Sequence, residues 1–247
     1  MWTYPKVIAH RGGGTLAPEN TLAGMRCGLE HGYRAVEFDV MLSSDGVPIL
    51  MHDPYFGRTV VGKGKVSDTS AQDLTQMDAG AWFSAQFAGE KVPTLQQVAD
   101  YCMANRIWMN IELKPAPGFA VETGRVTSAF MKAYLESNTD AALTPLFSSF
   151  APDALIAARA EAPHIPRGLL ATYVADDWRE RLDAVGAVAL HTDAKRMTPL
   201  LAREITAAGV GLFCYTVNDP AQARELFDWG VHAFCTDRLD LIPADFS

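Results

Sequence analysis

The sequence predicts an α/β protein built as a single (β/α)8 TIM barrel. Short runs rich in Val, Ile, Leu and Phe alternate with helix-like stretches that open at Pro, Thr or Asp. Such alternation implies parallel strands joined by right-handed crossovers, and eight units in about 240 residues suit a closed barrel better than an open sheet. Because no Pro-, Gly- or Ser-rich linker divides the chain, we expect one domain over residues 1–247.

Eight strands and several helices are expected in regular order. The strands span Lys6–His10, Ala35–Met41, Ile107–Lys114, Leu143–Ser149, Arg167–Thr172, Ala187–Thr192, Val210–Val217 and Val231–Thr236. The helices include Thr94–Ala104, Phe119–Glu136, Pro152–Ala160, Asp176–Val185, Pro199–Ala208 and Pro220–Trp229. A Gly-rich polar stretch at about residues 54–92 interrupts this order and predicts a small insertion after the second strand, since such insertions are more often functional lids than idle loops.

The composition limits the classes of partner. The chain has 29 acidic and 21 basic residues, a net charge of −8, and no run of Lys and Arg. Because binding to nucleic acid requires concentrated positive charge, we expect no nucleic-acid partner. A small anionic substrate would need local positive charge from a metal ion, Arg or Lys to offset the overall repulsion.

The chain is expected to be soluble and cytoplasmic. Its first residues do not resemble a secretion signal, and no apolar run reaches the roughly 20 residues of a membrane span. The four cysteines, Cys27, Cys102, Cys214 and Cys235, are scattered without a C-x-x-C pair, which is typical of reduced thiols. The sequence gives no indication of the oligomeric state.

Polar side chains gather along the first three strands. These strands carry His10-Arg11-Gly12, Glu37-Phe38-Asp39 and Glu112-Leu113-Lys114. Alternate residues of a strand share a face, so Glu37 and Asp39 point the same way. An acidic pair facing the interior of a parallel barrel is costly unless a cation compensates it.

A hairpin signal follows the second strand. Asp45-Gly46 is typical of a two-residue hairpin turn, and folding the chain about it pairs Asp39 with His52. His52 would then stand over the same opening as His10. Two histidines with an ordinary pKa near 6.5 suit the roles of acid and base at neutral pH.

The carboxylates Glu37, Asp39 and Glu112 form a hard oxygen site, which suits one divalent cation, Mg²⁺ or Ca²⁺, better than Zn²⁺. Together with Arg11 and Lys114, such an ion would neutralise the oxygens of a phosphodiester and stabilise charge in the transition state. On spacing alone, the same acids could instead be structural ion-pair partners of Arg11 and Lys114.

Five motifs in order resemble the glycerophosphodiester phosphodiesterase family. They are His10-Arg11-Gly12, Pro18-Glu19-Asn20-Thr21, Glu37-Phe38-Asp39, His52-Asp53 and Glu112-Leu113-Lys114. Later segments look like the family's remaining strand ends, namely Ser149-Phe150, Tyr215-Thr216-Val217-Asn218 and Thr236-Asp237. The resemblance covers nearly the whole chain and is strongest to the short cytosolic bacterial members. Departures at Phe56, Val60 and Ala151 affect the expected substrate preference rather than the chemistry.

The resemblance implies a (β/α)8 barrel that releases sn-glycerol 3-phosphate and an alcohol from deacylated phospholipids. It implies metal ligation by Glu37, Asp39 and Glu112. It also implies acid and base roles for His10 and His52, and phosphate contacts by Arg11 and Lys114. Attack by water and attack by the substrate's own glycerol hydroxyl, through a cyclic phosphate, both stay open.

Further candidates carry less specific signals. His191 is expected to contact substrate because it lies at a strand end, where barrel active sites are built, and Asn218 because it lies in a strand-end segment of the resemblance. Asn20 either orders the first loop or caps a helix. Trp82 and Phe83 either line the glycerol pocket or pack the insertion onto the barrel.

Three other interpretations compete with this hydrolase. A barrel that binds phosphodiesters without turnover would keep the same pocket, and a phospholipase D-like enzyme acting on lysophospholipids would share part of the motif. The run Gly12–Ala17 satisfies the dinucleotide-binding pattern G-x-G-x-x-A. In that motif the helix begins within the glycines, whereas here the helix start at Pro18 comes later, which argues against a dinucleotide site.

Overall fold

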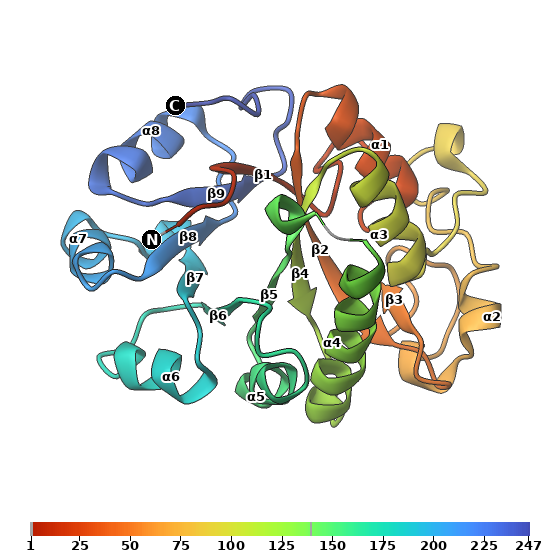
Figure 1. The fold of residues 1–247 in the computed structure, drawn as a ribbon. Coiled ribbons are helices and arrows are strands. Elements are labelled where there is room, and N and C mark those ends of the chain that lie inside the picture. Colours follow the sequence, from red (N-terminus) through yellow and green to blue (C-terminus); the bar gives the residue numbers. More distant parts are fainter. Residues whose placement is uncertain (1, 139) are drawn as a thin grey trace.

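Eight parallel strands close into a barrel in the computed structural model, which describes residues 2–138 and 140–247 (Figure 1). They are β1 (Val7–His10), β2 (Ala35–Leu42), β4 (Trp108–Leu113), β5 (Leu146–Ser149), β6 (Arg167–Ala171), β7 (Ala189–Asp193), β8 (Gly211–Tyr215) and β9 (Ala233–Thr236). Strand β1 pairs with both β2 and β9, which closes the ring. All eight expected strands are therefore confirmed.

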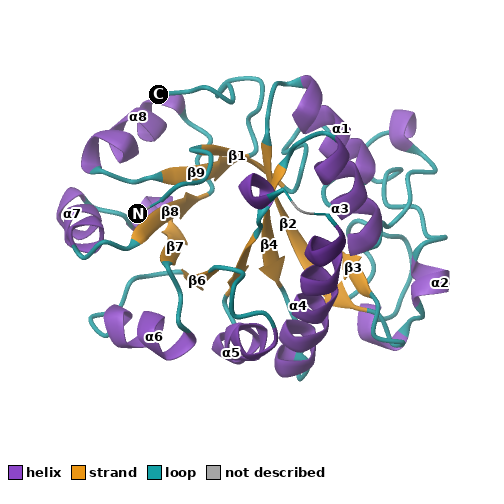
Figure 2. Ribbon diagram, viewed as in Figure 1, coloured by secondary structure: helices purple, strands orange, loops and turns teal. Residues whose placement is uncertain are grey.

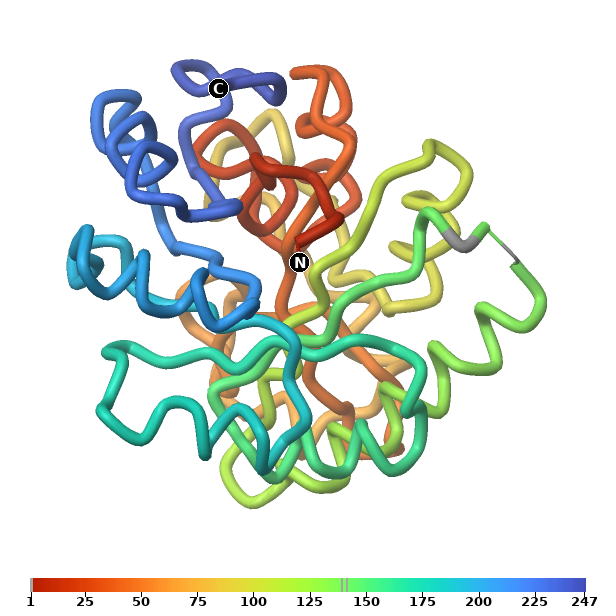
Figure 3. Tube along the Cα trace, turned by 60° about the vertical axis from the view of Figure 1, so that its left-hand side comes forward, coloured from red at the N-terminus to blue at the C-terminus, as the bar shows by residue number. Residues whose placement is uncertain are grey.

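Helices surround this ring (Figure 2). They are α1 (Leu22–Glu30), α3 (Leu95–Ala104), α4 (Ala120–Ser137), α5 (Pro152–Glu161), α6 (Trp178–Val185), α7 (Pro199–Ala207) and α8 (Pro220–Trp229), with short 3-10 turns η3 (Ala141–Leu143) and η4 (Ala194–Arg196). The side chains of Thr21, Thr94 and Thr198 each accept a first-turn backbone N–H, which fixes where α1, α3 and α7 begin. Figure 3 follows the chain round the ring, where its first and last segments meet.

The barrel interior is apolar at one end and polar at the other. Near the N-terminal ends of the strands, Trp108 and Phe213 fill the interior, and Tyr4 stacks on Trp108 with ring centroids 4.8 Å apart. Outward-facing residues such as Val36 and Phe38 pack instead into the core beneath the helices. Because apolar side chains fill the floor, the polar residues lie at the carboxyl ends of the strands, where barrel enzymes build their sites.

The β2–β3 hairpin differs from the expected register by one residue. Strand β3 (Pro48–Leu50) pairs Leu50 with Val40, whereas the expected two-residue turn pairs Val40 with Met51. The turn holds three residues because the N–H of Ser43 donates to the carbonyl of Val47, and Gly46 adopts a left-handed conformation with φ 77°. A three-residue loop with a left-handed glycine is a common hairpin alternative. The prediction that Asp39 faces His52 is wrong, because the backbone carbonyl of Asp39 accepts the backbone N–H of Met51.

The insertion lies outside the ring, beyond β3 and α1 in the chain's orange-to-yellow segment (Figure 1). It contains η1 (Val66–Asp68), α2 (Ala71–Leu74) and η2 (Ala85–Phe87), and a small apolar cluster joins it to Met41 of β2 and Ile49 of β3. Phe83 contacts Trp82 and Phe87, with centroids 5.6 Å apart in each pair. These aromatic residues therefore pack within the insertion.

Two expectations about the whole chain can be compared with the structure. The four cysteines are all unpaired, and Cys27 alone among them is partly exposed. Over the residues described, no helix combines the length and apolarity that crossing a membrane requires.

Candidate active site

Strand register brings the predicted acids together. Pairing of β1 with β2 sets His10 beside Glu37, and pairing of β2 with β4 sets Asp39 beside Glu112. One carboxylate oxygen from each of Glu37, Asp39 and Glu112 lies within 4.8 Å of the others, and all three residues are buried. The parallel register therefore assembles the cluster that alternation within single strands indicated.

The charges in this cluster are unbalanced. Lys114 Nζ lies 3.2 Å from Asp39 Oδ1 and 3.1 Å from Glu112 Oε1, and Arg11 Nε lies 3.5 Å from Asp39 Oδ2. Although burial opposes it, the charges of Lys114 and Arg11 hold the pKa of Asp39 below its usual range. Burial and the charge of Asp39 raise the pKa of Glu37 and of Glu112. The basic residues thus compensate Asp39 more fully than the two glutamates, although Lys114 also contacts Glu112. A divalent cation would relieve the remaining excess of negative charge.

His10 is held by a carboxylate from the far end of the chain. Its Nδ1 lies 2.6 Å from Oδ1 of Asp237, which follows β9. Asn218 donates from Nδ2 to the other oxygen of Asp237 at 2.9 Å and accepts the Asp237 backbone N–H at 2.8 Å. Burial lowers the pKa of His10, but the Asp237 hydrogen bond and the charge of Glu37 outweigh it and raise that pKa. Asn218, expected to touch substrate, is placed so that it orients Asp237.

His52 is held by an equivalent carboxylate. Its Nδ1 lies 2.8 Å from Oδ1 of Asp53, and the second Asp53 oxygen accepts from Nε of Arg58 at 2.5 Å. The two Nη atoms of Arg58 each donate to Glu19 at 2.7 Å, and Glu19 also accepts from Arg11 at 2.9 Å. Burial lowers the pKa of His52. This chain of ion pairs connects His52 to Arg11 through Arg58, a residue of the insertion.

Asn20 orders the first loop rather than capping α1. Its Nδ2 donates to Asp39 Oδ2 at 2.8 Å, its Oδ1 accepts the Asp39 backbone N–H at 3.1 Å, and Thr21 is the cap. The sequence reasoning assigned no role to Asp53, Asp237, Glu19 or Arg58. The first three lie in motifs already quoted, and a carboxylate beside a catalytic histidine is a common orienting partner. Arg58 lies in no such motif.

A cavity of about 230 Å³ lies among these residues. Its lining includes His10, Arg11, Glu37, His52, Glu112 and Lys114. His191 is at the bottom, fully buried, with its ring 4.5 Å from that of Phe213 and with neither ring nitrogen hydrogen-bonded among the described residues. Burial lowers the pKa of His191 to about 3, so it is a neutral side chain of the barrel interior. Because His191 also lines the cavity, its expected contact with substrate stays a prediction.

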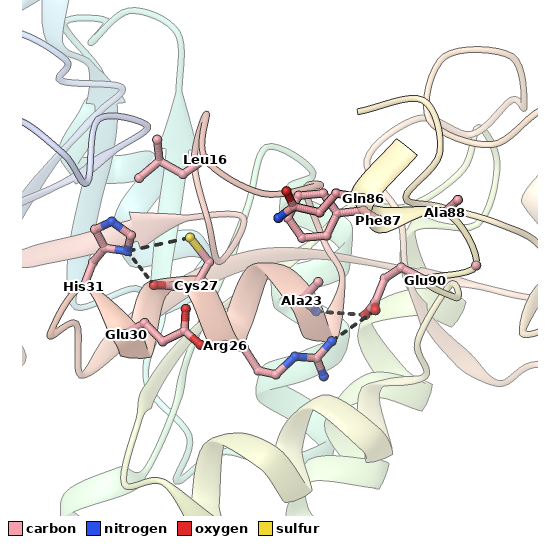
Figure 4. Close-up of a pocket in the computed structure, with 11 residues that line it drawn as sticks. Leu16, Ala23, Arg26, Cys27, Glu30, His31, Gln86, Phe87, Ala88 and Glu90 are labelled. Atoms are coloured by element: carbon pink, nitrogen blue, oxygen red, sulfur yellow. Dashed lines mark hydrogen bonds and ion pairs between the residues drawn. The ribbon is translucent and has the colours of Figure 1, made fainter. Parts of the chain in front are cut away.

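A larger hollow of about 790 Å³ lies between α1 and the insertion (Figure 4). The side chain of Glu90, in the insertion, contacts α1 here. It accepts the Ala23 backbone N–H at 2.8 Å and forms an ion pair with Arg26 at 3.0 Å. None of the predicted site residues lines this hollow. We therefore assign the chemistry to the smaller cavity and regard the Glu90 contacts as the fastening of the insertion to α1.

The chain is similar to known proteins over nearly its whole length. Residues 10–241 match the model of the glycerophosphoryl diester phosphodiesterase family. A glycerophosphodiester phosphodiesterase of Caldanaerobacter subterraneus subsp. tengcongensis is 33% identical over 232 residues, covering 94% of this chain and 93% of that protein. Another from Bacillus subtilis is 29% identical and covers 95% and 84%.

Solved structures give the same result. A phosphodiesterase of Oleispira antarctica, in complex with the product sn-glycerol-3-phosphate, superposes with a TM-score of 0.90 at 35% identity, covering 98% of this chain and 95% of that one. A glycerophosphodiester phosphodiesterase of Agrobacterium tumefaciens has a TM-score of 0.75 at 25% identity, covering 96% and 98%. The chain therefore belongs to the glycerophosphoryl diester phosphodiesterase family and is a hydrolase of phosphoric diesters.

Proposed function

We propose that this enzyme hydrolyses glycerophosphodiesters, the deacylated forms of phospholipids, to sn-glycerol 3-phosphate and an alcohol. The observation that carries the proposal is a buried three-carboxylate cluster beside two histidines, each with its Nδ1 bound to a carboxylate. The product named for the Oleispira antarctica structure supports the same product here.

We propose that Glu37, Asp39 and Glu112 hold one divalent cation, Mg²⁺ or Ca²⁺, because hard cations prefer carboxylate oxygens. When bound, the ion supplies positive charge against a non-bridging phosphate oxygen. Arg11 and Lys114 line the same cavity and contribute donors to the phosphate. Together they provide the local positive charge that a chain of net charge −8 needs in order to bind a small anion.

His10 and His52 are the proposed acid and base. Because Nδ1 of each ring faces a carboxylate, Nε2 is the nitrogen left to exchange a proton with substrate. One imidazole takes the proton of the attacking hydroxyl as its oxygen bonds to phosphorus. The other gives a proton to the alcohol oxygen as its bond to phosphorus breaks. The attacking hydroxyl belongs either to water, which gives glycerol 3-phosphate directly, or to the substrate's glycerol, which gives a cyclic phosphate that water then opens to glycerol 3-phosphate.

A metal-swept activity panel tests the ion, the reaction and the substrate range together. Glycerophosphocholine, glycerophosphoethanolamine and intact lysophosphatidylcholine are assayed after exhaustive chelation and after addition of Mg²⁺, Ca²⁺ or Zn²⁺. We expect glycerol 3-phosphate from the two deacylated diesters with Mg²⁺ or Ca²⁺, and none after chelation. Full activity of the chelated enzyme would remove the ion from the mechanism. Turnover of lysophosphatidylcholine alone would indicate a phospholipase D-like enzyme. Tight binding of the deacylated diesters without any product would indicate a barrel that binds phosphodiesters but does not hydrolyse them.

Substitution of the histidines tests the proton transfers. His10→Ala and His52→Ala should each lower kcat by about 10²–10⁴-fold, the usual contribution of a positioned acid or base. His164→Ala, at an exposed loop position, is the matched control. Circular dichroism confirms that the variants fold. Near-normal rates in both active-site variants would refute the assignment.

A cytoplasmic location completes the proposal. It is supported by four unpaired cysteines, which is the state expected in a reducing compartment. Cell fractionation of the native host tests it.

A further inference from the structure

One wall of the active-site cavity has no part in the proton transfers or in holding the phosphate. Phe150 follows β5 and Tyr215 ends β8, and both line the cavity. Their ring centroids are 5.8 Å apart and the ring planes meet at 77°. Phe150 is 45% exposed, which is high for a phenylalanine bordering a polar cavity. The pair therefore presents aromatic surface that a ligand can cover.

A carboxylate lies next to Tyr215, one member of this pair. Asp193, the last residue of β7, pairs in register with Tyr215. It borders an adjoining hollow that also reaches Tyr215 and Thr216. The Asp193 side chain accepts the Lys195 backbone N–H at 2.9 Å, while its nearest ion-pair contact, to Arg196, is long at 3.9 Å. Lys195 also borders this hollow, but among the described residues its side chain makes no ion pair with Asp193, so the negative charge of Asp193 is only partly compensated.

This wall suits an organic cation better than a polyol. Phe150 offers no hydrogen bond, and the Tyr215 hydroxyl already donates to the carbonyl of Ala171 at 3.1 Å. Aromatic faces attract cations that lie within about 6 Å of the ring centroid, quaternary ammonium groups above all. Quaternary ammonium groups neither donate nor accept hydrogen bonds. They can therefore bind to this wall although it offers no free hydrogen-bond donor.

We propose that Phe150, Tyr215 and Asp193 form a headgroup subsite for a quaternary ammonium group, which makes choline-type glycerophosphodiesters the preferred substrates. The inference rests on the proposed function and names the substrate class of the same site. Arg11 and Lys114 line the same cavity on the phosphate side, so its two walls match a substrate that carries an anion and a cation.

A pair of isosteric substrates isolates the charge. Glycerophosphocholine is compared with the 3,3-dimethylbutyl ester of glycerol phosphate, in which carbon replaces nitrogen and the shape is kept. With the metal-loaded enzyme, we expect kcat/KM to favour the choline diester about tenfold, as for a partly desolvated cation on an aromatic face. Equal kcat/KM for the two esters would overturn the subsite.

Substitutions at Phe150 and Asp193 test whether these residues cause the preference for the choline diester. Phe150→Leu keeps apolar bulk and removes the ring, so the choline preference should fall to about twofold or less, whereas Phe150→Tyr keeps the ring and should keep the preference. Asp193→Asn should lower the preference about threefold. Asp228→Asn, an exposed change of equal charge at the end of α8, is the control for net charge. Equal losses on both esters in Phe150→Leu and Asp193→Asn would contradict the proposal.

The outcomes separate this inference from the proposed function. Turnover of both esters without charge preference removes the subsite alone. If neither ester is hydrolysed, the proposed function fails, and calorimetric titration with phosphocholine and 3,3-dimethylbutyl phosphate still decides the subsite. If phosphocholine binds more tightly than 3,3-dimethylbutyl phosphate and Phe150→Leu removes this difference, the subsite is upheld. Equal binding of the two ligands overturns the subsite.

Discussion

Each active-site histidine is matched with a carboxylate at Nδ1. Asp237 holds His10 and Asp53 holds His52, with nitrogen–oxygen distances of 2.6 and 2.8 Å. A carboxylate in this position fixes the tautomer and stabilises the protonated ring. We therefore expect substitution of Asp237 or Asp53 to lower kcat, although neither residue belongs to the predicted acid–base pair.

Removing the charge of Asp237 tests this dependence. Asp237→Asn should lower kcat by about 10²-fold or more with little change in KM, because an amide can present an N–H to His10 Nδ1 and favour the wrong tautomer. Steady-state kinetics measures the effect. Asp240→Asn, which alters a surface pair with Arg238, is the control. A wild-type kcat in Asp237→Asn would show that His10 does not depend on this carboxylate.

Glu19 should make stability depend on pH. Burial raises its pKa, but hydrogen bonds from Arg58 and the charge of Arg11 outweigh burial and lower the pKa. A carboxyl with a lowered folded-state pKa stabilises the fold above its unfolded pKa of about 4.3, and this contribution disappears as the pH falls through the folded value. Glu19→Gln should therefore cost about 1–3 kcal/mol at pH 7.

Urea unfolding at neutral and acid pH measures this difference. The loss of stability in Glu19→Gln should shrink below about pH 4, because protonation removes the same charge from the wild type. Glu136→Gln changes an exposed residue of α4 and serves as the control. A destabilisation that grows on acidification would contradict the assignment.

At the level of elements, two sets of ion pairs help to hold the insertion in place. Glu90 attaches it to α1 through Ala23 and Arg26. Arg58 attaches it to the site, contacting Asp53 and Glu19. The second attachment adds three charge-assisted hydrogen bonds to the support of His52, so the insertion contributes to positioning as well as covering α1.

Arg58 tests the contribution of the insertion. Arg58→Lys should lower kcat about tenfold and Arg58→Gln more, because lysine cannot make the Nε contact and the forked contact together. NMR of the His52 ring nitrogens should show a changed tautomer ratio, which a purely structural role would not produce. Arg125→Lys, in a surface pair with Glu122, is the control. Unchanged kcat and tautomer in a folded Arg58→Gln would exclude a positioning role.

Over the whole molecule, barrel closure concentrates polar groups at one end. Aromatic packing around Trp2 and Trp108 closes the N-terminal end, while acids, bases and histidines meet at the other. Gathering buried carboxylates in this way costs stability unless a cation is bound. We also propose that barrel and insertion form one domain, and we expect one cooperative unfolding transition.

Cation binding should therefore stabilise the whole fold. An ion present at 100 times its Kd adds about 2.7 kcal/mol, which corresponds to a rise in Tm of about 5–10 °C for a chain of this size. Calorimetry with and without Mg²⁺ or Ca²⁺ measures the rise. Glu37→Gln should abolish it, while Glu30→Gln on α1 should keep it. A Tm unaffected by either ion in the wild type would contradict the metal site.

Much of the architecture is local in the sequence. The alternation of apolar runs and capped helices predicted all eight barrel strands, because each strand and helix depends mainly on its own pattern. The shared face of Glu37 and Asp39 also follows from the two-residue period of a strand. The hairpin register could not be derived in this way, since the turn's length depends on the conformation of Gly46 and on contacts made by Ser43.

By itself, then, the sequence determined the barrel, the three acids and the two histidines. Only the tertiary structure decided which residues orient the two histidines. The His10–Asp237 contact joins residues 227 positions apart, and it exists because β1 pairs with β9 when the ring closes. The Arg58–Glu19 contact likewise spans 39 positions between two loops. Closure also turned His191 into a buried ring of the barrel interior, since a strand-end position does not reveal how deeply its side chain lies.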